Sequence, residues 1–256
     1  MIATLLAIPH YNDTQRLEPF LGDLLEMLPP RFEIVVSDDG SRPEERKRLS
    51  ALVEAQRQAA GEDRAKLHLP LFAAANTGKG GAIQRAWSAF HSQDLVAFAD
   101  ADGAVSASEI LRAEVFMRTE RMRVDAHMAS RVKMLGRCVD RRLGRHLFGR
   151  VFATLVSELS GIPVYDSQCG LKILNRNALM TILPHLTVQG FAFDVELLFL
   201  LRKAGLAVQE FPVDWTDIPG SKVCLLKDSF RMAFQVHAIK HRLELLGPIT
   251  PRTDHE

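Results

Sequence analysis

Acidic residues follow short apolar runs at two places in the chain, and this pattern restricts the possible folds more than any other feature. The run at 95–99 continues into Asp100-Ala101-Asp102. A short apolar run bounded by turn residues is typical of a buried strand, so these carboxylates are expected at a strand's carboxyl end. Residues 32–36 run in the same way into Ser37-Asp38-Asp39-Gly40-Ser41. Open α/β sheets bind ligands at this edge, and the repeated arrangement predicts a metal–nucleotide site there.

Strand-like and helix-like segments alternate through the first half of the chain, which predicts a mostly parallel α/β sheet with helices on both faces. The expected strands are 2–8, 32–37, 66–71 and 95–99, and the expected helices are 17–28, a segment starting near 43, and 82–90. For the second half we expect helices at 106–121, 147–160, 191–203 and 225–246, strands at 124–130 and 208–213, and a basic loop at 131–150. The domain is therefore predicted to span 1–224, followed by an amphipathic helix and tail at 225–256.

Composition excludes several classes of protein. The 256 residues are 47% hydrophobic and 25% charged with a net charge of +1, which argues against a dedicated nucleic-acid binder. Three scattered cysteines and the lack of a secretory leader predict free thiols in the cytoplasm. No apolar run approaches the roughly 18 residues of a membrane-spanning helix, so any membrane contact is expected to be peripheral.

Asp100 and Asp102 are candidate ligands of a divalent cation. Mg²⁺ and Mn²⁺ favour carboxylate oxygens and are often held by one or two carboxylates together with substrate phosphates. The alternative is that the two acids are solvated or cap the following segment.

Asp38 and Asp39 are candidate ligands of a nucleotide base or ribose, because a carboxylate at a strand end holds ribose hydroxyls in dinucleotide folds. Pro9-His10-Tyr11-Asn12 follows the first expected strand and would supply an aromatic face beside the base. The alternative for Asp38 and Asp39 is a plain turn with a helix cap.

Lys79 lies in Gly78-Lys79-Gly80-Gly81, which matches neither a P-loop nor a dinucleotide fingerprint. A lysine and bare backbone N–H groups at a helix start still suit an anion, and a tight turn is the alternative. The basic segment 131–150 is either a solvated face or a phosphate site. Residues 215–222 resemble a loop or lid that ends in a phosphate-contacting lysine, or a surface turn.

Asp194 and Glu196 stand near the start of an apolar helix. Helix dipoles favour acids there, yet two acids in so apolar a segment suggest that one of them points at a ligand.

Taken in order, these motifs resemble glycosyltransferase family 2, and most of all its dolichyl-phosphate β-glucosyltransferases and their bacterial polyprenyl-phosphate relatives. The similarity covers about residues 1–225 and includes the following second-half motifs: Ser130-Arg131, Asp166-Ser167-Gln168-Cys169-Gly170-Leu171-Lys172, Phe191-Ala192-Phe193-Asp194-Val195-Glu196, Trp215-Thr216-Asp217 and Gly220-Ser221-Lys222.

The resemblance implies a GT-A fold, a UDP-glucose donor, Mg²⁺ or Mn²⁺, and inverting transfer of a hexose. The residues expected to bind the donor are Pro9, Tyr11, Asn12, Asp38, Asp39, Gly78, Lys79, Asp100 and Ala101, with the metal on Asp100 and Asp102. Those expected near the acceptor or its phosphate are Arg131, Gln168, Lys172, Trp215, Ser221 and Lys222. The catalytic set is Asp102, Asp194, Arg131 and Lys222, with Asp194 as the base if the acceptor is a hydroxyl.

Two positions favour the glucosyl branch over the mannosyl branch, because Ala104 and Ile218 stand where mannosyl relatives usually carry glutamine and arginine. The glucosyl relatives usually carry an amino-terminal membrane anchor that this chain lacks. The acceptor is therefore a polyprenyl phosphate or a saccharide hydroxyl, and a non-catalytic nucleotide-sugar-binding protein is a further alternative. The last helix either rests on an anionic membrane or packs on the domain.

Overall fold

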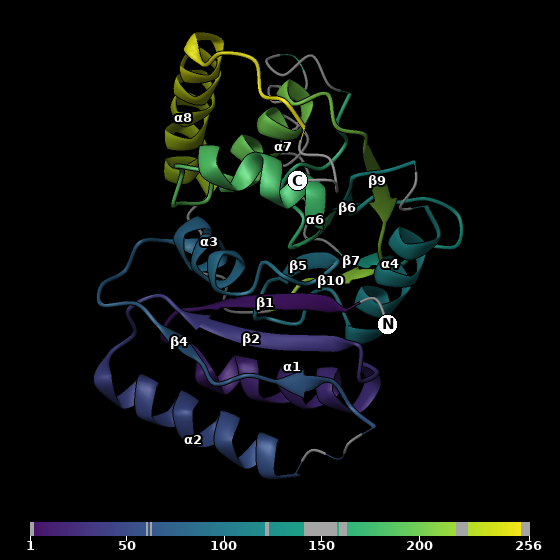
Figure 1. The fold of residues 1–256 in the computed structure, drawn as a ribbon. Helices are drawn as coiled ribbons and strands as arrows, with labels where there is room; N and C mark the ends of the chain where they lie inside the picture. The colour runs from purple at the N-terminus through teal and green to yellow at the C-terminus, as the bar shows by residue number, and fades with distance from the viewer. Residues whose placement is uncertain are drawn as a thin grey trace.

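An eight-stranded sheet forms the centre of the part of the chain that the computed structural model describes (Figure 1). That part comprises residues 3–59, 61, 63–120, 123–140, 158, 163–218 and 225–251. The strands lie in the order β3-β2-β1-β5-β8-β6-β9, and β4 pairs with β2. Their bounds are β1 (Thr4–His10), β2 (Phe32–Asp38), β3 (Lys66–Leu67), β4 (Leu71–Phe72), β5 (Leu95–Ala99), β6 (Ala126–Ser130), β8 (Leu171–Asn175) and β9 (Val208–Pro212).

The sheet is mostly parallel, which confirms the predicted fold class. Strand β8 is the antiparallel member and lies between β5 and β6, with Ala99 opposite Leu171 and Met128 opposite Lys172. Sequence reasoning quoted part of this segment only as a motif and assigned no strand to it. Asn175 ends the strand and caps the next helix, because its side chain accepts a hydrogen bond from the backbone N–H of Ala178.

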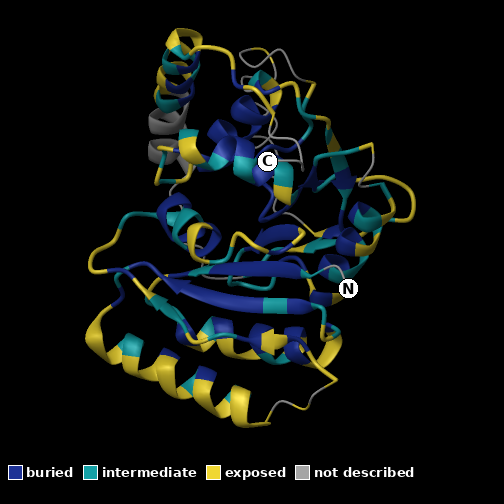
Figure 2. Cartoon of the chain, viewed as in Figure 1, coloured by how far each residue is buried: buried dark blue, intermediate teal, exposed yellow. Residues whose placement is uncertain are grey.

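Helices cover both faces of the sheet, as predicted. One face carries α1 (Thr14–Met27), α2 (Pro43–Ala59) and α4 (Ala107–Glu120). The other carries α3 (Lys79–Ala89), α6 (Arg176–Ile182), α7 (Phe193–Lys203) and α8 (Leu225–Leu245), with a short 3₁₀ turn, η1 (Leu183–His185), after α6. Figure 2 shows the central strands β1 and β2 as almost wholly buried between these layers.

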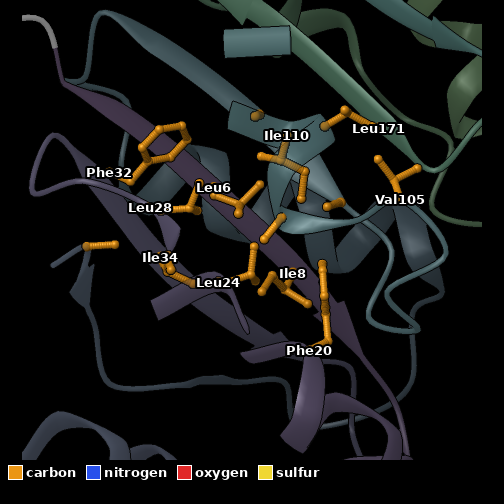
Figure 3. Close-up of a cluster of buried hydrophobic side chains, with 14 of the residues drawn as sticks. Leu6, Ile8, Phe20, Leu24, Leu28, Phe32, Ile34, Val105, Ile110 and Leu171 are labelled. Atoms are coloured by element: carbon orange, nitrogen blue, oxygen red, sulfur yellow. The ribbon is translucent and has the colours of Figure 1, made fainter. Parts of the chain in front are cut away.

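Strand β1 shows why its sequence is apolar throughout. Leu5 belongs to the core on the α3 and α7 face, whereas Leu6 and Ile8 belong to the core on the α1 face. Side chains alternate across a strand, so a strand covered on both faces needs apolar residues at nearly every position. Figure 3 shows Leu6 and Ile8 packed with Phe20 and Leu24 of α1. Burying each such leucine contributes about 2 kcal/mol.

Two further elements complete the description. Strands β7 (Val139–Asp140) and β10 (Trp215–Thr216) form a small parallel sheet of their own. One side of α8 packs on the domain, because Val236, Ile239 and Leu243 are buried in the core shared with α7, whereas Phe234 and Leu245 are exposed. Within the part of the chain that the structure describes, no helix combines the length and apolar character needed to cross a membrane.

Candidate active site

Four parallel strands of the sheet end at a common edge. β1, β2, β5 and β6 end at His10, Asp38, Ala99 and Ser130. The residues that directly follow these strands are Tyr11, Asp39, Asp100 and Arg131. Strand β8 runs in the opposite direction, so the segment 166–170 that precedes it reaches the same edge. The topology therefore brings together motifs that are more than a hundred residues apart.

Asp100 and Asp102 lie in the turn after β5. The Asp100 side chain is 39% exposed, and its Oδ1 lies 2.9 Å from Nζ of Lys79. The Asp102 side chain accepts a hydrogen bond from the backbone N–H of Ala104 at 3.1 Å. Burial and the negative charge of Asp100 raise the pKa of Asp102 above its usual value. Ala101 lies between the two acids and packs against the core on the α1 face.

Gly170 leaves room for the Asp100 side chain. The backbone N–H of Asp100 donates to the carbonyl oxygen of Gly170 at 2.9 Å. A Cβ atom at position 170 would lie 2.4 Å from Oδ2 of Asp100, much closer than van der Waals contact allows. Glycine is therefore needed here if the carboxylate is to keep its position.

Asp38 is completely buried, and neighbouring protein groups form hydrogen bonds with its carboxylate. Its carboxylate lies 3.0 Å from Nδ1 of His10 and accepts a hydrogen bond from the backbone N–H of Ser41 at 3.0 Å. Burial alone would raise the pKa of Asp38, but the hydrogen bonds of His10 and Ser41 lower it below its usual value. These contacts fix the turn that follows β2.

Asp39 joins this turn to the start of α3. Its carboxylate accepts hydrogen bonds from the N–H and hydroxyl of Thr77, at 2.9 and 2.6 Å, and from the N–H of Gly78 at 2.6 Å. Gly78 has a φ of 99°, a conformation open to glycine but strained for other residues. Asp39 thus holds the loop that leads into Lys79.

Residues 9–12 form the adjacent wall of the edge. Pro9 is the penultimate residue of β1, and the Tyr11 side chain after the strand is 45% exposed. Asn12 has a φ of 49°, and its backbone N–H donates to Oγ of Ser41 at 2.8 Å. An exposed aromatic ring therefore stands beside the turn held by Asp38, where sequence analysis expected the base.

Two lysines and two aspartates form a row of ion pairs that runs from the edge into the interior. Nζ of Lys79 lies 2.9 Å from Asp100 and 3.4 Å from Oδ2 of Asp194. Nζ of Lys172 lies 2.7 Å from Oδ1 of Asp194, and both of these side chains are almost wholly buried. Lys172 also donates to the carbonyl oxygens of Ser167 and Cys169. Asp194 therefore faces two ammonium groups of the protein.

Glu196, the second acid of α7, holds the loop before the helix. It accepts hydrogen bonds from the N–H and hydroxyl of Thr187 and from the N–H of Val188, and it pairs with Arg242 of α8. These partners give Glu196 a structural role.

The guanidinium of Arg131 donates two hydrogen bonds to Asp166, one of them 2.7 Å long from Nη2 to Oδ1, and the backbone N–H of Arg131 donates a third at 3.1 Å. Burial opposes the charge, but Asp166 raises the pKa of Arg131 above its usual value. The guanidinium also lies 5.4 Å from the centre of the Trp215 ring. The backbone N–H of Gln168 donates to Asp166 at 3.3 Å, which draws four of the motif residues into one cluster.

Buried polar atoms without a hydrogen bond gather around this cluster. Among the described residues they include Oγ of Ser130, Oγ of Ser167 and Nε2 of Gln168. Buried polar groups ordinarily have partners, so these three atoms mark a place where a polar ligand would find donors and acceptors.

The chain is similar in sequence to known proteins. The family model described as "Glycosyl transferase family 2" matches residues 6–182. The chain belongs to glycosyl transferase family 2. The dolichyl-phosphate β-glucosyltransferase of Saccharomyces cerevisiae is 31% identical over 242 residues, which are 89% of this chain and 71% of that protein. The enzyme of the same name from Dictyostelium discoideum is 30% identical over 251 residues, with 94% and 74% of the two chains covered. The predicted family and the prediction of an enzyme are therefore confirmed.

The fold of this glycosyltransferase also occurs in solved structures. Glucosyl-3-phosphoglycerate synthase from Mycobacterium tuberculosis, crystallised with Mn²⁺ and UDP-glucose, has a TM-score of 0.66 and 18% identity. The alignment covers 93% of this chain and 77% of that one. At this identity the likeness establishes the fold, and it confirms the predicted GT-A architecture.

Three residues of the glycosyltransferase edge received no role in the sequence analysis. They are His10, which contacts Asp38, Asp166, which holds Arg131, and Gly170, which makes room for Asp100. Their motifs were noted, but a hydrogen-bond partner distant in sequence cannot be identified from spacing. Ser221 and Lys222, together with the basic residues 141–150, lie outside the described residues, so their expected phosphate contacts stay predictions.

Proposed function

We propose that this glycosyltransferase moves a glucosyl group from UDP-glucose to a polyprenyl phosphate of the dolichyl type, with inversion at the anomeric carbon and with Mg²⁺ or Mn²⁺ as cofactor. The names of the relatives at about 30% identity support the glucosyl group and the lipid phosphate. The Mn²⁺ and UDP-glucose bound to the mycobacterial enzyme support the choice of donor and metal.

The carboxylates at the edge fit a divalent cation. Asp100 is part-exposed, and burial together with the negative charge of Asp100 raises the pKa of Asp102, so the two acids of this partly buried turn repel each other. A hard cation relieves this repulsion, and oxygen donors are those that Mg²⁺ and Mn²⁺ prefer. We infer that Asp100 and Asp102 hold the metal. When bound, the metal would supply positive charge to the leaving diphosphate.

The remaining residues of the edge would bind the donor and orient it. The exposed Tyr11 ring would lie against the uracil, beside the turn that Asp38 fixes and the loop that Asp39 holds. Asn12 and Gly78 would shape the wall on which the ribose rests. Fixed charges aimed at the developing negative charge are usually the largest contribution to catalysis, and Arg131 and Lys222 are the candidate cations.

The environment of Asp194 favours a phosphate acceptor over a hydroxyl, and this observation carries the proposal. A hydroxyl needs a general base, but Asp194 is 1% exposed and is paired with Lys79 and Lys172. A phosphate monoester, with a second pKa of about 6, is already a dianion near neutral pH. Its oxygen attacks the anomeric carbon as the bond to UDP breaks, and no proton has to be removed.

The acceptor phosphate would meet the cluster around Arg131, Gln168 and Trp215, where buried polar atoms lack partners. A lipid acceptor also places the reaction at a membrane surface, which we expect to be the cytoplasmic face. Co-sedimentation with liposomes that contain anionic lipid should reveal this contact, and binding that is independent of anionic lipid would contradict an electrostatic attachment.

The decisive experiment follows label from UDP-glucose into lipid. The purified protein, Mn²⁺, UDP-[¹⁴C]glucose and dolichyl phosphate should yield a labelled lipid extracted into organic solvent. The variant Asp102→Ala should lose this product. Label that appears only as free glucose, or only on an added saccharide, would reject the proposed acceptor. A panel of UDP- and GDP-sugars tested by thermal shift would show the donor that stabilises the fold most.

A further inference from the structure

The row of ion pairs through Lys79 reaches one of the carboxylates to which we assign the metal. Phe98 and Asp100 are two residues apart around the end of β5, and a strand directs such residues to the same face. This is the face covered by α3 and α7, which carry Lys79 and Asp194 (Figure 1). The ammonium of Lys79 lies 4.8 Å from the centre of the Phe98 ring and 2.9 Å from Asp100. The ammonium of Lys79 on α3 is thus held beside the carboxylate of Asp100 at the end of β5.

The charges of the row balance. Two ammonium groups, Lys79 and Lys172, face two carboxylates, Asp100 and Asp194. Asp194 is buried and shared between the two lysines, whereas Asp100 is the exposed member. A divalent cation that binds Asp100 without an accompanying anion would bring two further positive charges close to Lys79. The fixed ammonium would oppose that cation through a partly buried, weakly screened interaction.

We propose that Lys79 acts as a built-in counter-cation for Asp100, which weakens the binding of free metal and couples metal binding to the arrival of the diphosphate. This inference rests on the proposed metal site. The diphosphate supplies the negative charge that offsets Lys79 and the metal together, so the two ligands should bind cooperatively. Lys79 stands at the first position of α3, and its ammonium contacts Asp194 as well as Asp100, so Asp100 is not its only carboxylate partner. Lys79 is then a positioning residue that controls the order of loading.

Mn²⁺ binding measured without any sugar transfer tests this role. Titrations followed by the electron paramagnetic resonance signal of free Mn²⁺ would be made with and without UDP. Lys79→Met should bind Mn²⁺ on the order of tenfold more tightly than the wild type in the absence of UDP, because one positive charge beside the site is gone. The gain in Mn²⁺ affinity caused by UDP should shrink in this variant, since coupling between two ligands is reciprocal.

Asp194→Asn should shift the affinity in the opposite direction. Without the Asp194 charge, Lys79 is held by Asp100 alone, and free Mn²⁺ should bind several-fold more weakly. A general loosening of the site would weaken Mn²⁺ binding in both variants, so opposite signs distinguish the proposal from structural damage. Lys79→Gln, which keeps a polar side chain without the charge, replaces the methionine variant if the latter fails to fold.

Lys66→Met is the matched control. It removes the same charge from a lysine that is 67% exposed and lies 4.0 Å from Glu33, and its Mn²⁺ affinity should equal that of the wild type. If both Lys79 variants bind Mn²⁺ no more tightly than the wild type, while Asp102→Ala abolishes binding, the metal site stands and the inference about Lys79 is overturned. Failure of the wild type to bind Mn²⁺ in the presence of UDP overturns the proposed metal site and this inference together.

Discussion

His127 should make the folded protein sensitive to mild acid. The side chain lies on β6 and is 2% exposed, and neither ring nitrogen has a hydrogen-bond partner among the described residues. Its ring packs against Phe116 and Phe211, at centroid distances of 5.1 and 6.0 Å. Burial lowers the pKa of His127 from 6.5 to about 4. The imidazole is therefore held neutral in the fold, whereas it accepts a proton readily in the unfolded chain.

The sign and size of the effect follow from this difference. The folded state binds fewer protons than the unfolded state between pH 4 and 6.5, so the free energy of unfolding falls as the pH falls through this window. One pKa unit corresponds to about 1.4 kcal/mol, which makes the full loss about 3.5 kcal/mol. About 2.5 kcal/mol of it should be lost between about pH 7.5 and about pH 4.5. For a chain of this size the loss lowers the melting temperature by about 5 to 10 °C.

Urea unfolding at these two pH values, for the wild type and His127→Phe, measures the contribution. The phenylalanine variant should lose less stability on acidification by about 2.5 kcal/mol, because its ring takes up no proton. His127→Leu serves as a second variant if the larger ring overpacks the site. His91→Gln, at an exposed position, should behave as the wild type. The reasoning fails if the wild type and both His127 variants lose equal stability on acidification.

Two further predictions concern Gly170 and the cysteines. Gly170→Ala should weaken Mn²⁺ binding on the order of tenfold, since its Cβ would lie 2.4 Å from Oδ2 of Asp100. The control Gly22→Ala, whose Cβ would have no atom within 4 Å, should leave the Mn²⁺ affinity unchanged and add about 0.5–1 kcal/mol to the free energy of unfolding. Calorimetric Mn²⁺ titration checks the affinities, and unchanged binding by Gly170→Ala would show that Asp100 is not held as described. Burial raises the pKa of Cys169 to about 11, so iodoacetamide at mildly alkaline pH should label the exposed Cys138 long before Cys169, as read by peptide mass spectrometry. Equal labelling of the two thiols in the folded protein would contradict the burial.

Much of the fold could be predicted because its signals are local. The apolar run of β5 and the acids after it share a short stretch of chain, and parallel strands place all such strand ends at one edge. Strand β8 could not be predicted in the same way. It lies between β5 and β6 in the antiparallel direction, and the alternation of helices and strands predicts parallel strands only.

The roles of the charged residues divide along the same line. Spacing alone indicated that Asp100 and Asp102 belong together, and the ordered motifs indicated the family to which the chain belongs. Only the folded chain decided that Lys79 and Lys172 face Asp194, a residue that sequence analysis considered as a base. Ion pairs depend on which side chains meet across elements far apart in sequence. Local patterns determine strands, helices and their order, whereas the partners of a buried charge are determined by how those elements pack.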